Sequence, residues 1–239
     1  MHELLERDTK GWHALPSGAV PGSWSCTSTH RYDGPSVARA DRLDGVVVPP
    51  RNPRTRGRPD RRSGALEAPM SMYTIGLAGN NPTTEAWMRS LLDALPNSHA
   101  KSYVLHYGHW EDGSRYDVAR EAAKLQDTEP DLVLAKSLGV MIALDAYARR
   151  DFGPRRAVFM GTPLTLFGEA DVARLGRFVQ GVPTLLIQQR DDRTGTHAAL
   201  EECLPEGAIG EIVEIPGHDH AYPKDVVMPI ITGWLSAPA

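Results

Sequence analysis

The feature that most constrains the fold is a regular alternation of short apolar runs with longer amphipathic stretches, which begins at Met72. Short apolar runs closed by turn residues predict buried strands, and the stretches between them have the spacing of helices. The expected strands cover residues 73–78, 102–107, 131–135, 157–160, 183–187 and 210–215. The expected helices cover residues 83–95, 116–126, 137–149, 169–178, 196–203 and 224–235.

Six strands that alternate with helices predict an α/β fold, in which a mostly parallel central sheet carries helices on both faces. About 170 residues are enough to build a sizeable core of this kind. Such a fold places its chemistry at the carboxyl ends of the strands. The residues that follow each expected strand are therefore the candidates for a functional site.

The first 69 residues have a different texture. They hold 15 Gly and Pro residues and 11 basic against 8 acidic side chains, with six arginines inside residues 51–62. A stretch of this kind buries too little apolar area to offset its ordering entropy. We expect residues 1–69 to be a disordered Arg/Pro/Gly-rich extension and residues 70–239 to be the folded domain. The alternatives are an arginine arm that binds nucleic acid or an acidic partner, and a true start at Met70 or Met72.

Composition excludes several classes of protein. A net charge of −4 over 239 residues excludes a globally basic nucleic-acid binder, so nucleic acid is not an expected partner. Cys26 and Cys203 alone exclude a disulfide scaffold, and no apolar run is long enough to span a membrane. The N-terminus has no secretory signal, and the localisation expected is cytoplasmic. No phosphate-cradling loop or paired-glycine fingerprint occurs, so no cofactor is expected.

A candidate nucleophile follows the third expected strand. Residues 135–139 read Ala-Lys-Ser-Leu-Gly, and a helix follows at once. Only a sharp turn fits between strand and helix, which is the geometry of a nucleophile elbow with Ser137 at its tip. The alternative is that Ser137 has a structural role and caps the helix.

A serine nucleophile needs a base and an acid, and both types of residue occur at strand ends. His218 and His220 follow the sixth strand, and we favour His220, which lies deeper in the loop. Asp191 and Asp192 follow the fifth strand, and the residues alone do not choose between them. The chain order Ser, Asp, His is the order of this fold.

The developing oxyanion also needs donors. The backbone N–H of Leu138 lies at the start of the elbow helix, and the N–H of Asn80 lies in the loop after the first strand. A competing interpretation is a metal site formed by the pair of loop histidines with Asp219, His106 and His109, although no regular metal spacing links them.

These residues together resemble the α/β-hydrolase superfamily, and most closely its small, lidless members with a Lys-Ser-Leu-Gly elbow. The resemblance covers residues 72–237. Residues 107–110 (Tyr-Gly-His-Trp) resemble a Tyr-x-x-Trp stretch, residues 188–196 a Gln-Gly-x-x-Asp-Pro-Phe-Gly-Thr acid loop, and residues 217–222 a Gly-x-x-His-x-Phe/Tyr loop. The chain departs from these patterns at four positions: Ala78, Ala135, Gln189 and Arg193.

The resemblance implies Asp192 as the acid and His220 as the base. It implies a serine hydrolase, carboxylesterase-like, that acts on an ester or related acyl bond. We expect a small-molecule acyl substrate, and we expect no metal because the spacing of the candidate ligands is irregular. Too few residues separate Met160 from Pro183 for a cap domain. Selectivity would then come from loop side chains, namely Asn80, Asn81, His109, Trp110, Thr162, Leu164, Phe167 and Tyr222. The alternative is a non-catalytic protein of this fold that binds a ligand or partner through the same pocket.

Overall fold

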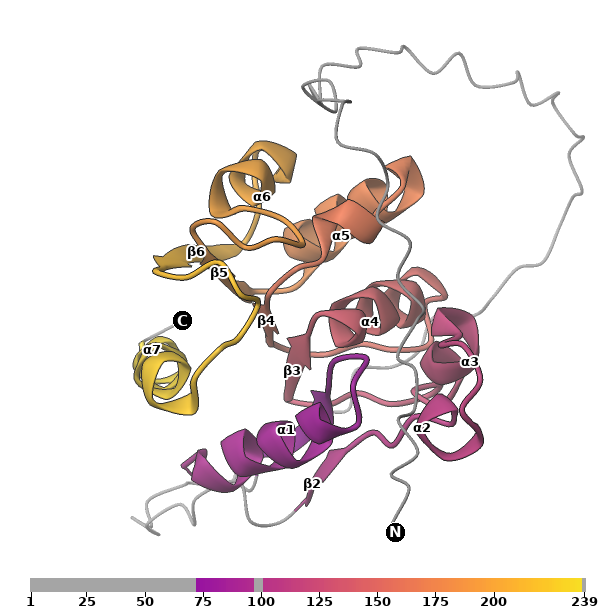
Figure 1. Cartoon of the computed structure of the whole chain (residues 1–239). Coiled ribbons are helices and arrows are strands. Elements are labelled where there is room, and N and C mark those ends of the chain that lie inside the picture. The colour runs from indigo at the N-terminus through magenta and orange to yellow at the C-terminus, as the bar shows by residue number, and fades with distance from the viewer. Residues whose placement is uncertain (1–71, 97–100, 238–239) are drawn as a thin grey trace, which may run out of the picture. The chain divides into compact units, whose positions relative to one another are not determined.

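The computed structural model describes residues 72–96 and 101–237, so the prediction for residues 1–69 lies outside the described residues. Six parallel strands form one sheet in the order β2-β1-β3-β4-β5-β6 (Figure 1). The strands are β1 (Tyr73–Leu77), β2 (Lys101–Val104), β3 (Leu132–Lys136), β4 (Ala157–Met160), β5 (Thr184–Gln189) and β6 (Gly210–Ile215). The fold class expected from the sequence is confirmed.

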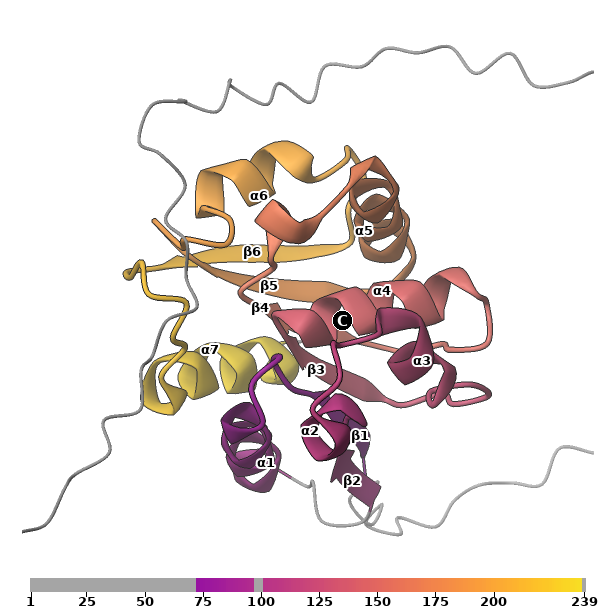
Figure 2. The same cartoon turned by 45° about the vertical axis from the view of Figure 1, so that its right-hand side comes forward.

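Helices cover both faces of the sheet (Figure 2). On one face, the helices α3, α4, α5 and α6 pack in one core cluster, while α1 and α7 pack in a second cluster on the other face. The helices are α1 (Thr83–Ala94), α2 (His109–Asp112), α3 (Val118–Ala123), α4 (Leu138–Ala148), α5 (Glu169–Gly181), α6 (His197–Cys203) and α7 (Lys224–Ser236), with a 3-10 turn η1 (Leu164–Leu166).

The central strands are apolar on both faces because both faces are covered. All residues of β3 and β4 are buried, and Val133 and Ala157 are register partners. Consecutive side chains of a strand point to opposite faces. Leu134 accordingly belongs to the cluster of α1 and α7, whereas Val133 belongs to the cluster of α4 and α5. This packing fixes the register, because a slip by one residue would exchange the two faces.

Several elements differ from the expected bounds, among them α3 (Val118–Ala123), which is shorter, and α5 (Glu169–Gly181), which is longer. The strand expected at 102–107 runs from Lys101 to Val104, and the four-residue helix α2 follows it where no helix was expected. The fifth strand continues to Gln189 instead of ending at Ile187, because both glutamines are buried and hydrogen-bonded. Among the described helices, none is long and apolar enough to cross a bilayer.

Candidate active site

The turn between β3 and α4 is a strained elbow. Ser137 has φ 51° and ψ −114°, a backbone conformation that residues other than glycine rarely adopt. Its N–H donates to the carbonyl of Met160 at 3.1 Å, which ties the elbow to the end of β4. A Cβ at Gly139 would lie 2.1 Å from the carbonyl oxygen of Leu77, so the helix can begin this close to β1 only with glycine there. The Ser137 side chain is thereby presented at the carboxyl edge of the sheet.

His220 and Asp192 are brought together beside this edge. His220 Nδ1 lies 2.8 Å from Asp192 Oδ2 and 3.0 Å from Oδ1. A carboxylate at this distance favours the tautomer with the proton on Nδ1, which leaves Nε2 unprotonated. Nε2 is buried and has no hydrogen-bond partner in the described part of the chain. In this tautomer of the neutral ring, Nε2 carries the lone pair.

The His220 ring lies directly against the end of β4. A Cβ at Gly161 would meet His220 Cε1 at 2.8 Å, and Gly161 follows the residue that accepts the Ser137 N–H. No hydrogen bond joins the Ser137 hydroxyl to His220 within residues 72–96 and 101–237. Catalytic hydrogen bonds are often long or absent without substrate. The two groups are neighbours at one sheet edge and not a bonded pair.

Asp192 is held as a carboxylate by its donors. Burial alone would raise its pKa, but hydrogen bonds from His220, the Thr194 N–H and the Tyr222 hydroxyl outweigh burial and lower the pKa to about 2. The Thr194 N–H and hydroxyl both donate to Oδ1 at 2.8 Å, and the Tyr222 hydroxyl donates to Oδ2 at 2.8 Å. Asp192, rather than the exposed Asp191, thus provides the carboxylate that contacts the histidine.

A search of the known proteins adds only general likeness. No protein-family model and no curated protein matches the sequence. Among solved structures, the type II thioesterase YbtT of the yersiniabactin pathway is 14% identical, with a TM-score of 0.45 over 69% of this chain and 92% of its own. Est816, an N-acyl homoserine lactone degrading enzyme, is 11% identical, with a TM-score of 0.46 over 68% and 93%. A thermophilic esterase is 18% identical, with a TM-score of 0.38 over 69% and 87%.

The described sheet and the loops at its carboxyl edge show the architecture directly. The described part of the chain has a parallel sheet, an elbow at the end of a central strand, and an aspartate and a histidine after later strands, in that chain order. This is the arrangement that the resemblance to the α/β-hydrolase superfamily predicts. In this fold the oxyanion donors are the N–H after the elbow serine and an N–H from the loop after the first strand of this sheet.

Both donors predicted for the oxyanion lie near the elbow. Leu138 is the first residue of α4, where backbone N–H groups have no partner within the helix. The loop of Asn80 passes over the elbow, since a Cβ at Gly79 would lie 3.8 Å from Ser137 Cβ. The Asn80 carbonyl accepts from Trp110 Nε1 at 2.8 Å and from His109 Nε2 at 3.1 Å. These two bonds fix the peptide plane between Asn80 and Asn81, which is next to the plane that carries the Asn80 N–H.

The residues predicted to bind substrate also have partners within the protein. The Asn81 side chain accepts from the N–H and hydroxyl of Thr83, both at 3.0 Å, and so supports the start of α1. His109 and Trp110 hold the Asn80 loop. Tyr222 is 2% exposed, and its hydroxyl is used on Asp192. Thr162 is buried, whereas Leu164 and Phe167 are half-buried.

Two residues beside the candidate site, Gln189 and Lys136, are not predicted from the sequence. Gln189 contacts the histidine loop through its side chain, and Lys136 is buried beside the elbow. The sequence signal for Gln189 is that it stands where the acid-loop pattern has glycine. A polar residue at the end of a strand is equally typical of a solvent-exposed loop, so this signal does not predict a buried amide. Lys136 stands next to the serine, but its burial depends on Trp87 and Tyr222, which are distant in the sequence.

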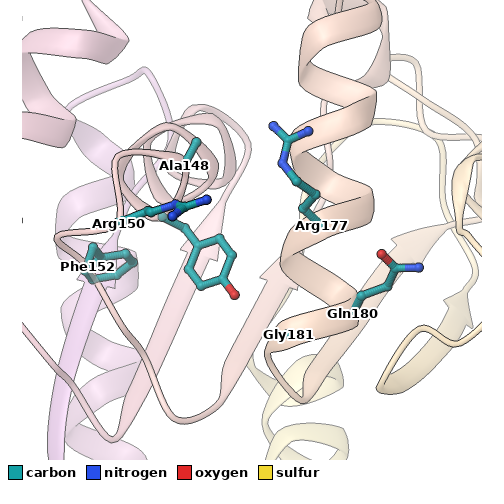
Figure 3. Close-up of a pocket in the computed structure, with 7 residues that line it drawn as sticks. Ala148, Arg150, Phe152, Arg177, Gln180 and Gly181 are labelled. Atoms are coloured by element: carbon teal, nitrogen blue, oxygen red, sulfur yellow. The ribbon is translucent and has the colours of Figure 1, made fainter. Parts of the chain in front are cut away.

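A metal site is the competing interpretation of the sequence, and the described part of the chain also contains a cavity outside the elbow. Within the described ranges, no three His, Cys, Asp or Glu side chains are grouped to hold a metal ion. A cavity of about 630 Å³ lies between α4 and α5, away from the elbow (Figure 3). Its lining includes none of the predicted site residues and consists of Tyr147, Ala148, Arg150, Phe152, Arg177, Gln180 and Gly181.

Proposed function

We propose that the protein is a serine hydrolase that cleaves an ester or related acyl bond in a small molecule. Ser137 is the nucleophile, His220 the general base and acid, and Asp192 the group that orients the imidazole. The observation that carries the proposal is the His220–Asp192 pair, with 2.8 Å between Nδ1 and Oδ2 and with no hydrogen-bond partner for Nε2 among the described residues. A free serine hydroxyl is a weak nucleophile, and such a pair is what activates it.

The reaction proceeds in two steps of the same kind. Ser137 Oγ attacks the acyl carbon while its proton passes to His220 Nε2, and the carbonyl oxygen becomes an oxyanion bound by the N–H groups of Leu138 and Asn80. The tetrahedral adduct collapses, and the proton on Nε2 leaves with the alcohol. Water then attacks the acyl-serine, giving its proton to Nε2, and the acid departs as Ser137 recovers its hydrogen.

The loops around the elbow favour a small substrate and an open site. The connection from β4 to β5 holds only η1 and α5, and α5 packs on the sheet. Leu164 and Phe167 of that connection are half-buried apolar side chains, suited to contact an acyl chain. We therefore expect short or medium acyl groups to be accepted and the alcohol part to be selected weakly.

The proposal is tested by labelling the purified full chain with a fluorophosphonate probe, beside Ser137→Ala and His220→Ala. We expect covalent labelling of the wild type, none of Ser137→Ala, and a loss of several orders of magnitude in rate for His220→Ala. Circular dichroism verifies that the variants fold. Labelling that persists in Ser137→Ala would refute the nucleophile. A folded wild type that is not labelled would favour a non-catalytic binding protein of this fold.

A further inference from the structure

The side chain of Gln189 occupies an unusual place at the end of β5. It is 3% exposed, although its strand ends here and the acid loop begins. Burial of an amide without hydrogen bonds costs several kcal/mol. The partners of this amide therefore indicate what the buried side chain does.

All the partners of the Gln189 amide lie on the histidine loop. Oε1 accepts the backbone N–H of His220 at 2.9 Å. Nε2 donates to Asp219 Oδ1 at 3.0 Å and also to the carbonyl of Ala221. One amide group thus contacts three consecutive residues, with His220 in the middle. The loop comes so close that a Cβ at Gly217 would lie 2.4 Å from Nε2.

The backbone that this amide contacts is strained. His220 has φ 63°, a left-handed conformation that residues other than glycine rarely adopt. Such a conformation persists only where surrounding contacts determine it. The bonds to Asp192 orient the imidazole ring, but they do not hold the main chain that carries it. The N–H bond to Gln189 acts directly on that main chain.

The backbone of Gln189 also reaches the acid side of the pair. Its N–H donates to the Tyr222 hydroxyl at 3.1 Å, and that hydroxyl donates to Asp192 Oδ2. One residue therefore contacts the loop of the base through its side chain and the support of the acid through its main chain. A glycine at this position, as in the resembling pattern, keeps only the second contact.

We propose that the Gln189 side-chain amide is a positioning residue that sets the location of His220 for proton transfer. This inference rests on the proposed function. Misplacement of a catalytic group by about 1 Å can cost about 100-fold in rate. Loss of the amide consequently lowers turnover while leaving substrate binding largely unchanged, because the amide itself is buried behind the loop.

The test compares Gln189→Met and Gln189→Glu with the wild type, in the full chain, by hydrolysis of p-nitrophenyl acetate and by the rate of fluorophosphonate labelling. Methionine has a similar length and neither donor nor acceptor. We expect kcat to fall about 10- to 100-fold in Gln189→Met, with KM within about threefold. In Gln189→Glu we expect a similar loss, because a carboxylate would face the Asp219 carboxylate and the Ala221 carbonyl.

A reversed hydrogen bond separates positioning from mere packing. In Gln189→Glu with Asp219→Asn, the asparagine amide can donate to the new carboxylate, so kcat should recover severalfold over Gln189→Glu alone. Asp219→Asn by itself keeps the accepting oxygen and should stay near wild type. The control for stability is Thr184→Val, which removes a buried hydrogen bond to Val182 at the other end of β5. It should lower the thermal midpoint without lowering kcat.

Each outcome decides the inference. Wild-type kcat in Gln189→Met overturns it and leaves the proposed function standing, provided that Ser137→Ala abolishes labelling. A loss of kcat without recovery in the double variant also overturns it, as does an equal loss in Thr184→Val. If the wild type itself neither hydrolyses the ester nor labels, the proposed function fails first, and the role of Gln189 in proton transfer falls with it.

Discussion

At the scale of single residues, Asp192 links stability to pH. Its folded pKa of about 2 lies below the ordinary value of 3.8, so the unfolded chain binds more protons between these values. Its contribution, about 2 kcal/mol, is present above pH 3.8 and is lost as the pH falls through about 2. We expect Asp192→Asn to flatten the loss of unfolding free energy across this window, measured by urea titration at stepped pH. If the unfolding free energy of Asp192→Asn falls with pH as steeply as that of the wild type, the hydrogen bonds to Asp192 do not account for the pH dependence.

Lys136 is the other buried charge beside the serine. It is 8% exposed, and its ammonium lies 5.7 Å from the Tyr222 ring and 5.9 Å from the Trp87 ring. Burial lowers its pKa, although nearby carboxylates, Asp192 first among them, act in the opposite direction. The Lys136 amine therefore binds its proton less tightly in the folded state than in the unfolded chain, and its positive charge destabilises the folded state at neutral pH.

We expect Lys136→Met to raise the thermal midpoint at neutral pH, since methionine fills a similar volume without the charge. The advantage should shrink as the pH rises toward the ordinary pKa of lysine, about 10.4, because the folded wild type has by then lost the proton. Differential scanning calorimetry at the two pH values measures both effects. A variant that melts earlier than the wild type at neutral pH would show that contacts of the ammonium outweigh its burial.

At the scale of elements, the elbow between β3 and α4 stores strain that can be measured. A residue other than glycine at φ 51° and ψ −114° costs about 1–3 kcal/mol, whereas glycine avoids the clash of Cβ. Ser137→Gly and Ser137→Ala both remove the hydroxyl, so their difference isolates the backbone. We expect the glycine variant to be more stable by about 1 kcal/mol after its greater entropy loss is counted. Urea titration decides the order, and a more stable alanine variant would argue against strain.

The elements that were predicted well are those whose bounds are set locally. Strands β4 and β6 match the expected bounds because their apolar runs are followed at once by Gly161 and Pro216. The end of β5 was misjudged because Gln188 and Gln189 are polar, and only contacts with distant loops show that they are buried. Helix α2, only four residues long, has no periodicity to detect.

The same distinction holds for the site. The elbow, the acid loop and the histidine loop follow from the rule that parallel strands deliver their carboxyl ends to one edge. The hydrogen-bond donors to Asp192, and the contact of the Gln189 amide with the His220 backbone, do not follow from this rule. Thr194 and Gln189 act through side-chain geometry that only the assembled loops define.

At the scale of the whole molecule, the sheet joins the site to the core. Ser137, Asp192 and His220 follow three different strands, β3, β5 and β6, and the His220 ring lies against Gly161, the residue after β4. Their relative positions therefore depend on pairing between β3 and β6 across four adjacent strands. All of these strands, and the helices on both faces, lie between Tyr73 and Ser236.

This arrangement leads to a prediction for the N-terminal 69 residues. Because the strands and core clusters of the described ranges consist of residues from Met72 onward, we expect a chain of residues 70–239 to fold with the same thermal midpoint. Its rate of fluorophosphonate labelling should equal that of the full chain. A midpoint lower by several degrees, or a slower rate at equal folded fraction, would mean that residues 1–69 contribute to the domain or to the site. Restoring them in trans as a peptide would then distinguish a contact with the site from an effect on folding, since only the former recovers the rate at an unchanged midpoint.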